Sequence, residues 1–491
     1  MEYIIYCTTV LAISVSLFYI YAKYKLSYWR KRGVKTPPTH LIFGNFKDVV
    51  TLKKRPAEVL CDIYNNADPN DPYIGFYIFH KPMLLLRDPD LIKRIMITDF
   101  DIFPNRRFGS RDQKDVTDLE SLLAMQQPKW KYVRSKLTSA FTGQKLKIIT
   151  PSIVECGKLM LNYIDNLPTG VGVEPKDMSS RYIVDILNSY AFGIATNSFD
   201  EKTNVLWKDC VKLFCDLQAI LTFLIFFFIP EWSHLIRPLK KRTLENLKSV
   251  FWNSISAREK TGSKRGDFID VLLTLKNGEQ NPIYKFEGSN LLAHPISVMV
   301  AGFEATTDAL AFCLYELARH PDHQDTLYNE IQTYVSNKEL TLDVINEMPF
   351  LDSLVIEILR LYPPLPMTDR IATRDYKIEN TGLIIEKGVA VYMSANSINQ
   401  DPKYFSDPQN FIPTREYENK KFHESLPFGI GPRSCIGQKM AIIMTKIGLI
   451  TIISQYILSY KQPNEDIKSI HTFTNVPDKF RLLFQKRDNR S

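Results

Sequence analysis

The sequence predicts a mainly α-helical protein with small β-sheets, an α+β fold that follows an N-terminal transmembrane helix. Residues 3–22 contain no charged side chain. Helical periodicity dominates most of the remaining chain, whereas the strand-like segments are short and few. The composition, with 45% hydrophobic and 24% charged residues, is ordinary for a globular protein and excludes a disordered or collagen-like chain.

Net charge and cysteine content narrow the class of protein further. A net charge of +8 over 491 residues is mild, so it suits an acidic membrane surface or an acidic protein partner better than nucleic acid. The seven cysteines include no CxxC pair, and their number is odd. We therefore expect no disulfide framework and a reducing compartment for most of the chain.

The N-terminus has the features of an uncleaved membrane anchor. A helix needs about 20 apolar residues to cross a bilayer, and the charge-free run has that length. Basic residues begin at Lys23, so the positive-inside rule places the rest of the chain in the cytosol. A cleaved signal peptide is the alternative, but the basic segment that would precede one is missing. We expect an anchor at 1–22, a basic, proline-containing linker at 23–45 and a single domain at 46–491.

The rest of the chain predicts a series of helices separated by short strands. A hairpin is expected at 73–86, where two β-rich runs flank a short turn. The long helix at 290–319 contains Pro295, so we expect its regular part to begin only there. A later helix at 352–361 must stop before Pro363. The other expected elements are helices at 130–141, 153–164 and 184–192, short strands and turns beyond 376, and a last helix that follows Cys435 and runs through Met440 to Ile452 (440–452).

The uncharged run at 217–229 allows three interpretations. It is short for a second membrane span. A helix of the core would also be apolar throughout. We favour a partly exposed apolar surface that dips into the membrane and borders a substrate entrance.

The most informative segment is the glycine-rich loop at 428–437. Its three glycines allow a tight loop to approach a large flat ligand. Cys435 directly precedes the last expected helix, and a helix N-terminus favours the metal-binding thiolate form of a cysteine. Arg433 can pair with an anionic group of the same ligand. A dinucleotide-binding fingerprint is excluded, because its third glycine would fall on Ser434.

This loop resembles the haem-binding loop FxxGxRxCxG of the cytochrome P450 family, with every fixed position filled. The resemblance implies the cytochrome P450 fold, a triangular helical haem domain, and the cofactor haem b (iron protoporphyrin IX). It also implies that Cys435 is the axial ligand of the iron, with Phe428, Arg433 and Gly437 at the cofactor. A Cys thiolate ligand pushes electron density towards O–O cleavage.

A second set of residues resembles the family's structural ion network. Glu357 and Arg360 share a helix face at i and i+3, although alone such a pair is typical of a solvated surface. Their place before the haem loop resembles the family's buried ExxR motif, whose arginine is tied to a later loop that matches Arg415. We expect a structural network here, even though the family's usual Glu before that arginine is Thr414.

Three arginines match the family's partners of the haem propionates. Trp130 and Arg134 stand at i and i+4 and resemble the WxxxR motif of its C-helix. Residue-wise matching gives the same role to Arg370 and Arg433. Three cations suit two carboxylates in a half-buried site, because unpaired buried charge is costly.

The long helix carries a segment at 301–307 that resembles the family's oxygen-activation motif, [AG]GxxT. Ala301 leaves room for the flat cofactor, and Glu304 and Thr306 are candidates for proton delivery. The family's threonine falls on Ala305, and Thr306 lies about 100° further around the helix. A π-bulge could restore its direction; otherwise a water molecule or a substrate hydroxyl must supply the proton.

The resemblance covers nearly the whole chain and is closest to insect microsomal members that metabolise xenobiotics. It implies a monooxygenase that inserts one atom of O2 into a lipophilic small molecule at the cytosolic side of the endoplasmic reticulum membrane. The chain has no flavin or NAD fingerprint. Electrons from NADPH would therefore come through NADPH–cytochrome P450 reductase, with cytochrome b5 as a second candidate donor. No nucleic acid partner is expected.

Family position also suggests where the partners would bind. The basic residues Lys129, Lys131, Arg433 and Lys439 would form a docking face for an acidic flavoprotein. The segments expected to face the substrate are 103–125, 213–228, 298–305, 365–368 and 473–474.

Two other functions stay open at this point. A haem-thiolate isomerase or dehydratase would turn over without NADPH, and Ala305 is the feature that allows it. A non-enzymatic haem-carrying membrane protein would form no product at all with reductase, NADPH and lipophilic compounds.

Overall fold

A computed structural model describes residues 1–108, 121–168, 170–215, 217–235, 240–335, 338–416, 420–460 and 480–487. The chain forms two compact units. Unit 1 consists of Met1–Phe108, Met367–Asp401 and Ile430–Arg433, and unit 2 of Gly109–Pro366, Pro402–Gly429 and Ser434–Ser491. The expected single domain at 46–491 stays a prediction.

Unit 1 is built around a four-stranded sheet in the order β1–β2–β6–β3. The predicted hairpin is confirmed, because β1 and β2 pair antiparallel with Tyr73 opposite Leu86. β2 pairs parallel with β6, which in turn pairs antiparallel with β3. All residues of β3 and β6 are buried, so the sheet forms the core of this unit. The bounds are β1 Tyr73–Ile78, β2 Lys81–Leu86, β3 Met367–Ile371 and β6 Ala390–Ser394, with a small second sheet of β4 Tyr376–Lys377 and β5 Ile384–Ile385.

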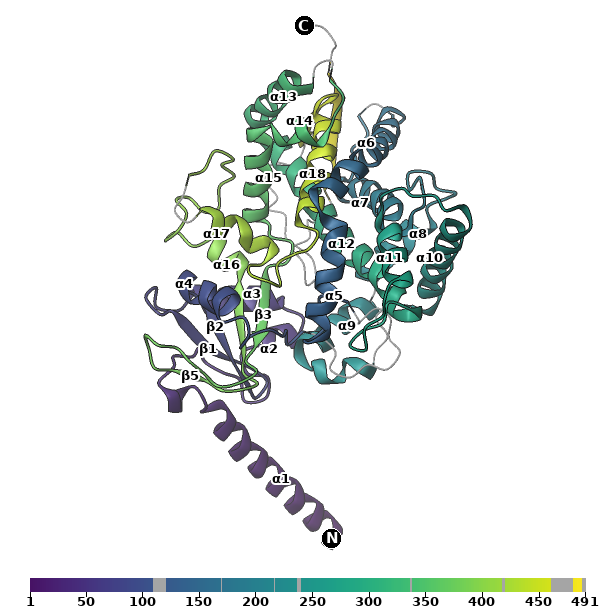
Figure 1. The fold of residues 1–491 in the computed structure, drawn as a ribbon. Helices are drawn as coiled ribbons and strands as arrows, with labels where there is room; N and C mark the ends of the chain where they lie inside the picture. The colour runs from purple at the N-terminus through teal and green to yellow at the C-terminus, as the bar shows by residue number, and fades with distance from the viewer. Residues whose placement is uncertain are drawn as a thin grey trace. The chain divides into compact units, whose positions relative to one another are not determined.

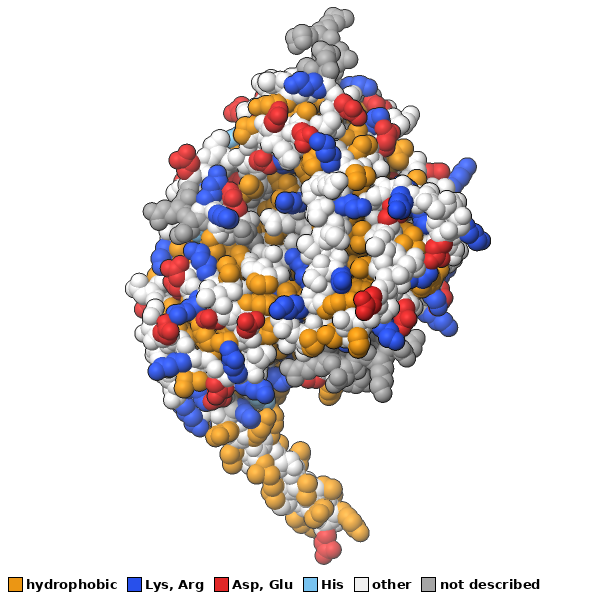
Figure 2. All heavy atoms as spheres, in the orientation of Figure 1, with side chains coloured by type: hydrophobic (Ala, Val, Ile, Leu, Met, Phe, Trp, Pro, Cys, Tyr) orange, Lys and Arg blue, Asp and Glu red, His pale blue; other side chains and the backbone are white. Residues whose placement is uncertain are grey.

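Helix α1 (Glu2–Leu26) projects from the sheet of unit 1 (Figure 1) and carries mostly hydrophobic side chains (Figure 2). Its most apolar stretch has a mean hydropathy of 1.9, and none of that stretch is buried in the protein. The predicted N-terminal apolar helix is confirmed, and it continues four residues past Ala22. Just beyond it, the buried Trp29 donates hydrogen bonds from its backbone N to Tyr77 Oη (3.0 Å) and from Nε1 to Phe76 O (3.2 Å). The start of the chain is thereby fastened to β1.

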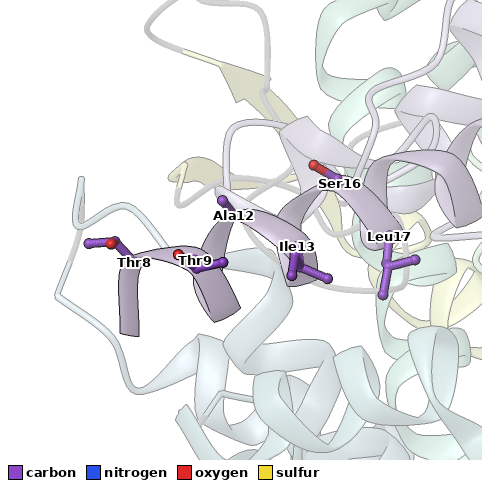
Figure 3. A pocket seen from close by; sticks show the side chains of 6 residues that line it. All are labelled: Thr8, Thr9, Ala12, Ile13, Ser16 and Leu17. Carbon is purple, nitrogen blue, oxygen red and sulfur yellow. The ribbon is translucent and has the colours of Figure 1, made fainter. Parts of the chain in front are cut away.

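A shallow hollow runs along one side of α1 (Figure 3). Its lining residues recur once per helical turn, and they are Thr8, Thr9, Ala12, Ile13, Ser16 and Leu17. The hydroxyls of Thr8 and Thr9 donate to backbone carbonyls one turn earlier in the same helix. The six lining residues include no ionisable group, and the hydroxyls of Thr8 and Thr9 are already hydrogen-bonded within the helix. This surface therefore suits contact with lipid chains rather than catalysis.

The remaining helical elements of unit 1 are short. They are a 3₁₀ turn at Arg30–Arg32, α2 Lys47–Val50, α3 Pro56–Asn65, α4 Pro89–Lys93, a π-helical turn at Arg94–Thr98 and α16 Ala395–Asn399.

Helix α12 (Gly288–Arg319) is the central element of unit 2, where it contacts α7 (Pro175–Leu187), α15 (Pro349–Leu361) and α18 (Gln438–Ile453). Its length and composition would allow it to span a membrane, but 67% of the relevant stretch is buried inside the protein, so it is a core helix. The expected start at Pro295 is wrong, since the helix begins seven residues earlier. Burial of the turn before the proline, Leu291–His294, outweighs the hydrogen bond that proline cannot make.

The helices predicted around residues 130–141, 153–164, 184–192, 352–361 and 440–452 are confirmed. The remaining helices of unit 2 are α5 Lys129–Leu137, α6 Gly143–Asp165, α8 Val205–Cys215, α9 Leu217–Phe228, α10 Lys241–Thr261, α11 Phe268–Asn277, α13 Pro321–Val335, α14 Leu342–Asn346 and α17 Lys420–Ser425. Shorter turns are 3₁₀ at Thr138–Phe141, Pro230–Leu235 and Leu426–Phe428 and π-helical at Asn188–Phe192, and a two-stranded sheet pairs β7 Tyr456–Tyr460 with β8 Leu482–Lys486.

The uncharged run at 217–229 forms α9, whose environment is mixed. Its C-terminal residues Phe226, Phe227 and Phe228 are buried, whereas Leu221 is 50% exposed. The segments Val205–Phe214 and Gln218–Phe228 are together apolar enough for a membrane span but meet at a bend of 45°. The helix therefore belongs partly to the core and partly to the surface. It combines features of the core-helix interpretation and of the interpretation as a partly exposed apolar surface.

Candidate functional site

The loop before α18 presents a cysteine at the start of a helix. In unit 2 the backbone N of Cys435 donates to Phe428 O at 2.8 Å, which folds the loop back on itself. Gly429 has φ +74°, a left-handed conformation that favours glycine. Cys435 is an exposed cysteine that forms no disulfide, and it lies three residues before α18 begins at Gln438. The loop thus offers a sulfur ligand where the helix dipole favours its thiolate form.

The part of the loop that belongs to unit 1 is tightly packed. Gly431 has φ +78°, and a Cβ there would overlap the carbonyl oxygen of Met96. Arg433 is only 4% exposed, and its Nε donates to Pro104 O at 2.5 Å. The expected place of Arg433 on an exposed docking face is therefore wrong, because its guanidinium is directed into the protein.

Unit 1 gathers arginines around Arg370. That residue is buried on β3, and its Nη1 donates to Asp369 O at 2.7 Å, whereas its Nε has no hydrogen-bond partner among the described residues. Burial lowers the pKa of Arg370 well below its usual value, and the positive charges of Arg106 and Arg433 lower it further. Asp369 is the carboxylate that opposes them. A cluster with this excess of positive charge is suited to bind anionic groups.

Arg106 is a member of this cluster that sequence reasoning missed. Its Nη1 donates to Thr368 Oγ1 at 2.6 Å, next to Arg370 on β3. The neighbouring Arg107 holds the carboxylate of Asp369 through its backbone N. The pair of adjacent arginines was the available signal, but nothing local links it to a strand more than 260 residues later.

Unit 2 brings Arg134 and Cys435 into each other's electrostatic range. Arg134 lies one helical turn after Trp130 on α5, and Trp130 is buried. Burial lowers the pKa of Arg134, while the negative charge of a Cys435 thiolate acts to raise it. A candidate propionate partner is therefore close to the candidate iron ligand within one unit.

The middle of α12 carries a less buried stripe on an otherwise buried helix. Ala301 is exposed, and Val298 and Ala305 are partly exposed at the spacing of successive turns. Glu304 and Thr306, on either side of Ala305, are both buried. The helix is regularly α-helical throughout this segment, without the π-bulge that would turn Thr306 onto the stripe. The Thr306 side chain consequently lies off the stripe.

Glu304 takes part in a buried ion cluster with α7. Lys176 Nζ donates to Glu304 Oε1 at 2.8 Å and lies 3.1 Å from Asp308 Oδ1. Sequence reasoning selected Glu304 but missed Lys176 and Asp308. An acid four residues after Glu304 in an apolar helix was a visible signal, whereas the lysine lies 128 residues earlier.

The predicted ExxR residues lie together in unit 2. Arg360 makes a double contact with Glu357, at 2.8 Å through both Nε and Nη2. Arg415 Nε donates to the same carboxylate at 3.1 Å, and the backbone N of Ile412 donates there too. Further donors from both guanidiniums reach the carbonyls of residues 406–410. This fully buried network fixes the loop at 406–415 against α15.

The comparison with known proteins settles the family. The family model Cytochrome P450 matches residues 34–484. This chain belongs to the cytochrome P450 family. It is 33% identical over 475 residues to Cytochrome P450 6k1 of Blattella germanica, covering 91% of this chain and 90% of that protein. It is 32% identical to two Drosophila melanogaster proteins: Probable cytochrome P450 6g2, covering 88% of this chain and 89% of that protein, and Cytochrome P450 6a2, covering 91% and 92%.

The expected fold class and the likeness to insect members of the family are confirmed. The chain is a cytochrome P450 monooxygenase, and the family implies a haem-thiolate cofactor, O2, a redox partner and a small-molecule substrate. The described residues of this P450 fit such a cofactor. Unit 2 offers the exposed Cys435 near Arg134, and unit 1 offers the cationic cluster around Arg370. Thiolate and carboxylate-binding arginines are the groups that a haem with two propionates requires.

Part of the expected substrate-facing surface of this P450 falls outside the described residues. This applies to 109–120 within the segment 103–125, to residue 216 in the segment 213–228, and to 473–474. The segment 298–305 is described and contains the partly exposed stripe of α12.

Proposed function

We propose that this cytochrome P450 monooxygenase oxidises a lipophilic small molecule at the cytosolic face of the endoplasmic reticulum membrane. The substrate class we have in mind is a xenobiotic, such as an insecticide or plant toxin, or an endogenous lipid or hormone. The apolar stripe of α12 and the apolar α9 support a lipophilic substrate, and α1 supports a membrane setting. The observation that carries the proposal is the exposed Cys435 just before α18 in a chain of this family.

We assign the cofactor as haem b, with Cys435 as the axial ligand of its iron. Phe428 and Gly437 of the loop and Ala301 of α12 would lie against the ring. Once bound, the haem-thiolate group supplies the reductive activation of O2. The residues proposed to hold its propionates are Trp130, Arg134, Arg370 and Arg433. Glu357, Arg360 and Arg415 are given a structural role.

The electron donor we propose is NADPH–cytochrome P450 reductase, with cytochrome b5 as a second candidate. Lys129 and Lys131 at the start of α5 and Lys439 at the start of α18 are exposed in unit 2. Such residues can attract an acidic flavoprotein and raise its rate of association.

For proton delivery we propose Glu304, and we keep the hypothesis that Thr306 supplies the hydroxyl missing at Ala305. The second part requires the regular α12 to open locally, because Thr306 now lies off the stripe. On this hypothesis Thr306→Ala lowers the product formed per NADPH about 10-fold or more. Thr307→Ala, which removes the next buried hydroxyl, is the control. Unchanged coupling in Thr306→Ala would remove Thr306 from the mechanism.

The main experiment is a reduced, carbon monoxide-bound difference spectrum of the wild type and Cys435→Ser, followed by product analysis. The wild type should show the spectrum of a thiolate-bound haem and should form an oxygenated product only with reductase and NADPH. The serine variant should lose both. Product without NADPH would replace this function by an isomerase or dehydratase, and a thiolate spectrum in Cys435→Ser would overturn the assignment of the ligand.

A further inference from the structure

Helix α12 carries a second buried acid next to the proton-delivery candidate. Asp308 lies four residues after Glu304, so the two carboxyl groups occupy the same helix face on successive turns. Asp308 is 0% exposed, and Glu304 is buried as well. Neither oxygen of Asp308 has a hydrogen-bond partner among the described residues. An ionised Asp308 would have lost its water and gained only one nearby cation, Lys176, whose Nζ lies 3.1 Å from Asp308 Oδ1.

Both acids face the same cation. Lys176 Nζ lies 2.8 Å from Glu304 Oε1 and 3.1 Å from Asp308 Oδ1, and the lysine side chain is 21% exposed. Lys176 and Glu304 are the charged groups that act on Asp308 among the described residues. With all three groups ionised, this buried set would carry one net negative charge. Uptake of one proton makes it neutral.

The proton belongs on Asp308. Burial raises the pKa of Asp308 well above its usual value, and the negative charge of Glu304 raises it further. Burial acts to lower the pKa of Lys176, and the charges of Asp308 and Glu304 act to raise it, with a net direction upward. Once Asp308 is neutral, Glu304 remains as the carboxylate that pairs with Lys176 at 2.8 Å. The shorter contact of Lys176 goes to Glu304, whose Oε1 accepts its hydrogen bond at 2.8 Å.

We propose that Asp308 holds a proton at neutral pH and that Asp308, Lys176 and Glu304 act together as a proton store for the reduction of O2. This inference rests on the monooxygenase function proposed above. In the transfer, the Nζ–H bond of Lys176 breaks as an O–H bond forms on Glu304, and this O–H bond breaks in turn when Glu304 gives the proton up for the reduction of O2. The O–H bond of Asp308 then breaks as a new Nζ–H bond forms, which leaves Lys176 unchanged. Asp308 regains its proton from solvent by way of Lys176, whose side chain is partly exposed.

Ala305 is the reason that such a proton store would be needed. Ala305 lies on the partly exposed stripe and carries no hydroxyl. Insertion of one oxygen atom from O2 into a substrate uses two electrons and two protons, and the second oxygen leaves as water. A chain without a hydroxyl at this position depends more strongly on a nearby acid that is already protonated. Asp308 and Lys176 act through Glu304, so they are positioning residues.

The first test is infrared spectroscopy of the haem-loaded, full-length protein near pH 7, which requires no turnover. The wild type should show the carbonyl stretch of a protonated, buried carboxylic acid, and Asp308→Asn should lose it. Asp177→Asn is the matched control, because Asp177 is the neighbour of Lys176 on α7 and pairs with Arg181 at 3.0 Å. That control should keep the band. A wild type without the band, or a band that survives in Asp308→Asn, would overturn the proposal.

The second test follows coupling, the product formed per NADPH consumed, across pH. Wild-type coupling should fall as pH rises and Asp308 loses its proton. In Asp308→Asn it should be about 10-fold lower and independent of pH, and Asp308→Glu should restore the wild-type profile. Lys176→Gln should lose coupling but keep the infrared band, because Asp308 then lacks the one cation that acts on it among the described residues and stays protonated.

A wild-type pH profile in Asp308→Asn, with a normal carbon monoxide spectrum, would overturn the proton store and leave the monooxygenase function intact. Absence of any wild-type product would instead overturn the proposed function, and the infrared band would still report on Asp308. If Asp308→Asn does not fold, the response of Lys176→Gln decides, and loss of the band in that variant contradicts the proposal.

Discussion

Arg370 and Asp308 show two outcomes of the same physical problem, a buried ionisable group with too little opposite charge around it. Asp308 can resolve the problem by taking up a proton, because a carboxyl group is neutral when protonated. Arg370 cannot easily lose its proton, since a guanidinium stays charged in proteins. The charge of Arg370 is therefore stabilised best by an anionic ligand. For this reason we interpret the arginine cluster in unit 1 as an anion-binding site.

We expect Arg370→Met to have opposite effects on the empty and on the haem-loaded protein. The haem-free variant should be as stable as the wild type or more stable, because an uncompensated buried cation is replaced by an apolar side chain. Haem should dissociate about 10- to 100-fold faster, as expected for the loss of a charge-assisted hydrogen bond worth about 1.5–3 kcal/mol. Transfer of haem to an excess of haem-free globin measures this rate. The exposed Arg374→Met is the control, and equal rates in the two variants would contradict the assignment.

At the scale of elements, the sequence predicts those features that depend on residues close together in the chain and does not predict those that join distant residues. The hairpin of β1 and β2 and the helix after Cys435 depend on neighbouring residues, and both were predicted. The parallel pair of β2 and β6 joins Leu84 to Val391, and no local pattern indicates this register. The same holds for Lys176, whose partners lie on another helix. The start of α12 was misjudged for a different reason, since the proline signal is local and the packing that overrides it is not.

Helix α12 also gives a prediction about acid stability. His294 is buried there, with Nε2 3.2 Å from Tyr284 Oη, and burial lowers the pKa of His294 to about 3. In the unfolded chain the same group has a pKa of about 6.5. Between these values the unfolded chain binds the extra proton, so stability falls as pH falls, by about 1.4 kcal/mol per unit at most. The free energy of unfolding of His294→Gln, measured by urea unfolding at several pH values, should lack this part of the dependence on pH. Above pH 7.5 the free energies of the variant and the wild type should change with pH in parallel. Equal slopes below pH 6 would contradict the prediction.

At the scale of the whole molecule, α1 can be tested by its removal. Deletion of residues 2–26 leaves Trp29 and its hydrogen bonds to β1 in place. We therefore expect the shortened chain to move from the membrane pellet to the soluble fraction and to keep its carbon monoxide spectrum. The full chain should stay in the pellet after high-salt and alkaline washes. A shortened chain that still sediments with membranes would show a second membrane contact, and Leu221→Glu on the exposed part of α9 would then test that helix.

Unit 1 is assembled from three segments that are far apart in the chain, and this has a consequence during synthesis on the ribosome. The hairpin of β1 and β2 emerges early, but β6, its partner, follows only about 300 residues later. At a translation rate of about 5–20 residues per second, the open edge of β2 waits for roughly 15–60 s. Such an edge can pair with another nascent chain. Tethering to a bilayer through α1 and shielding by a chaperone would both limit encounters between neighbouring polysomal chains in that interval.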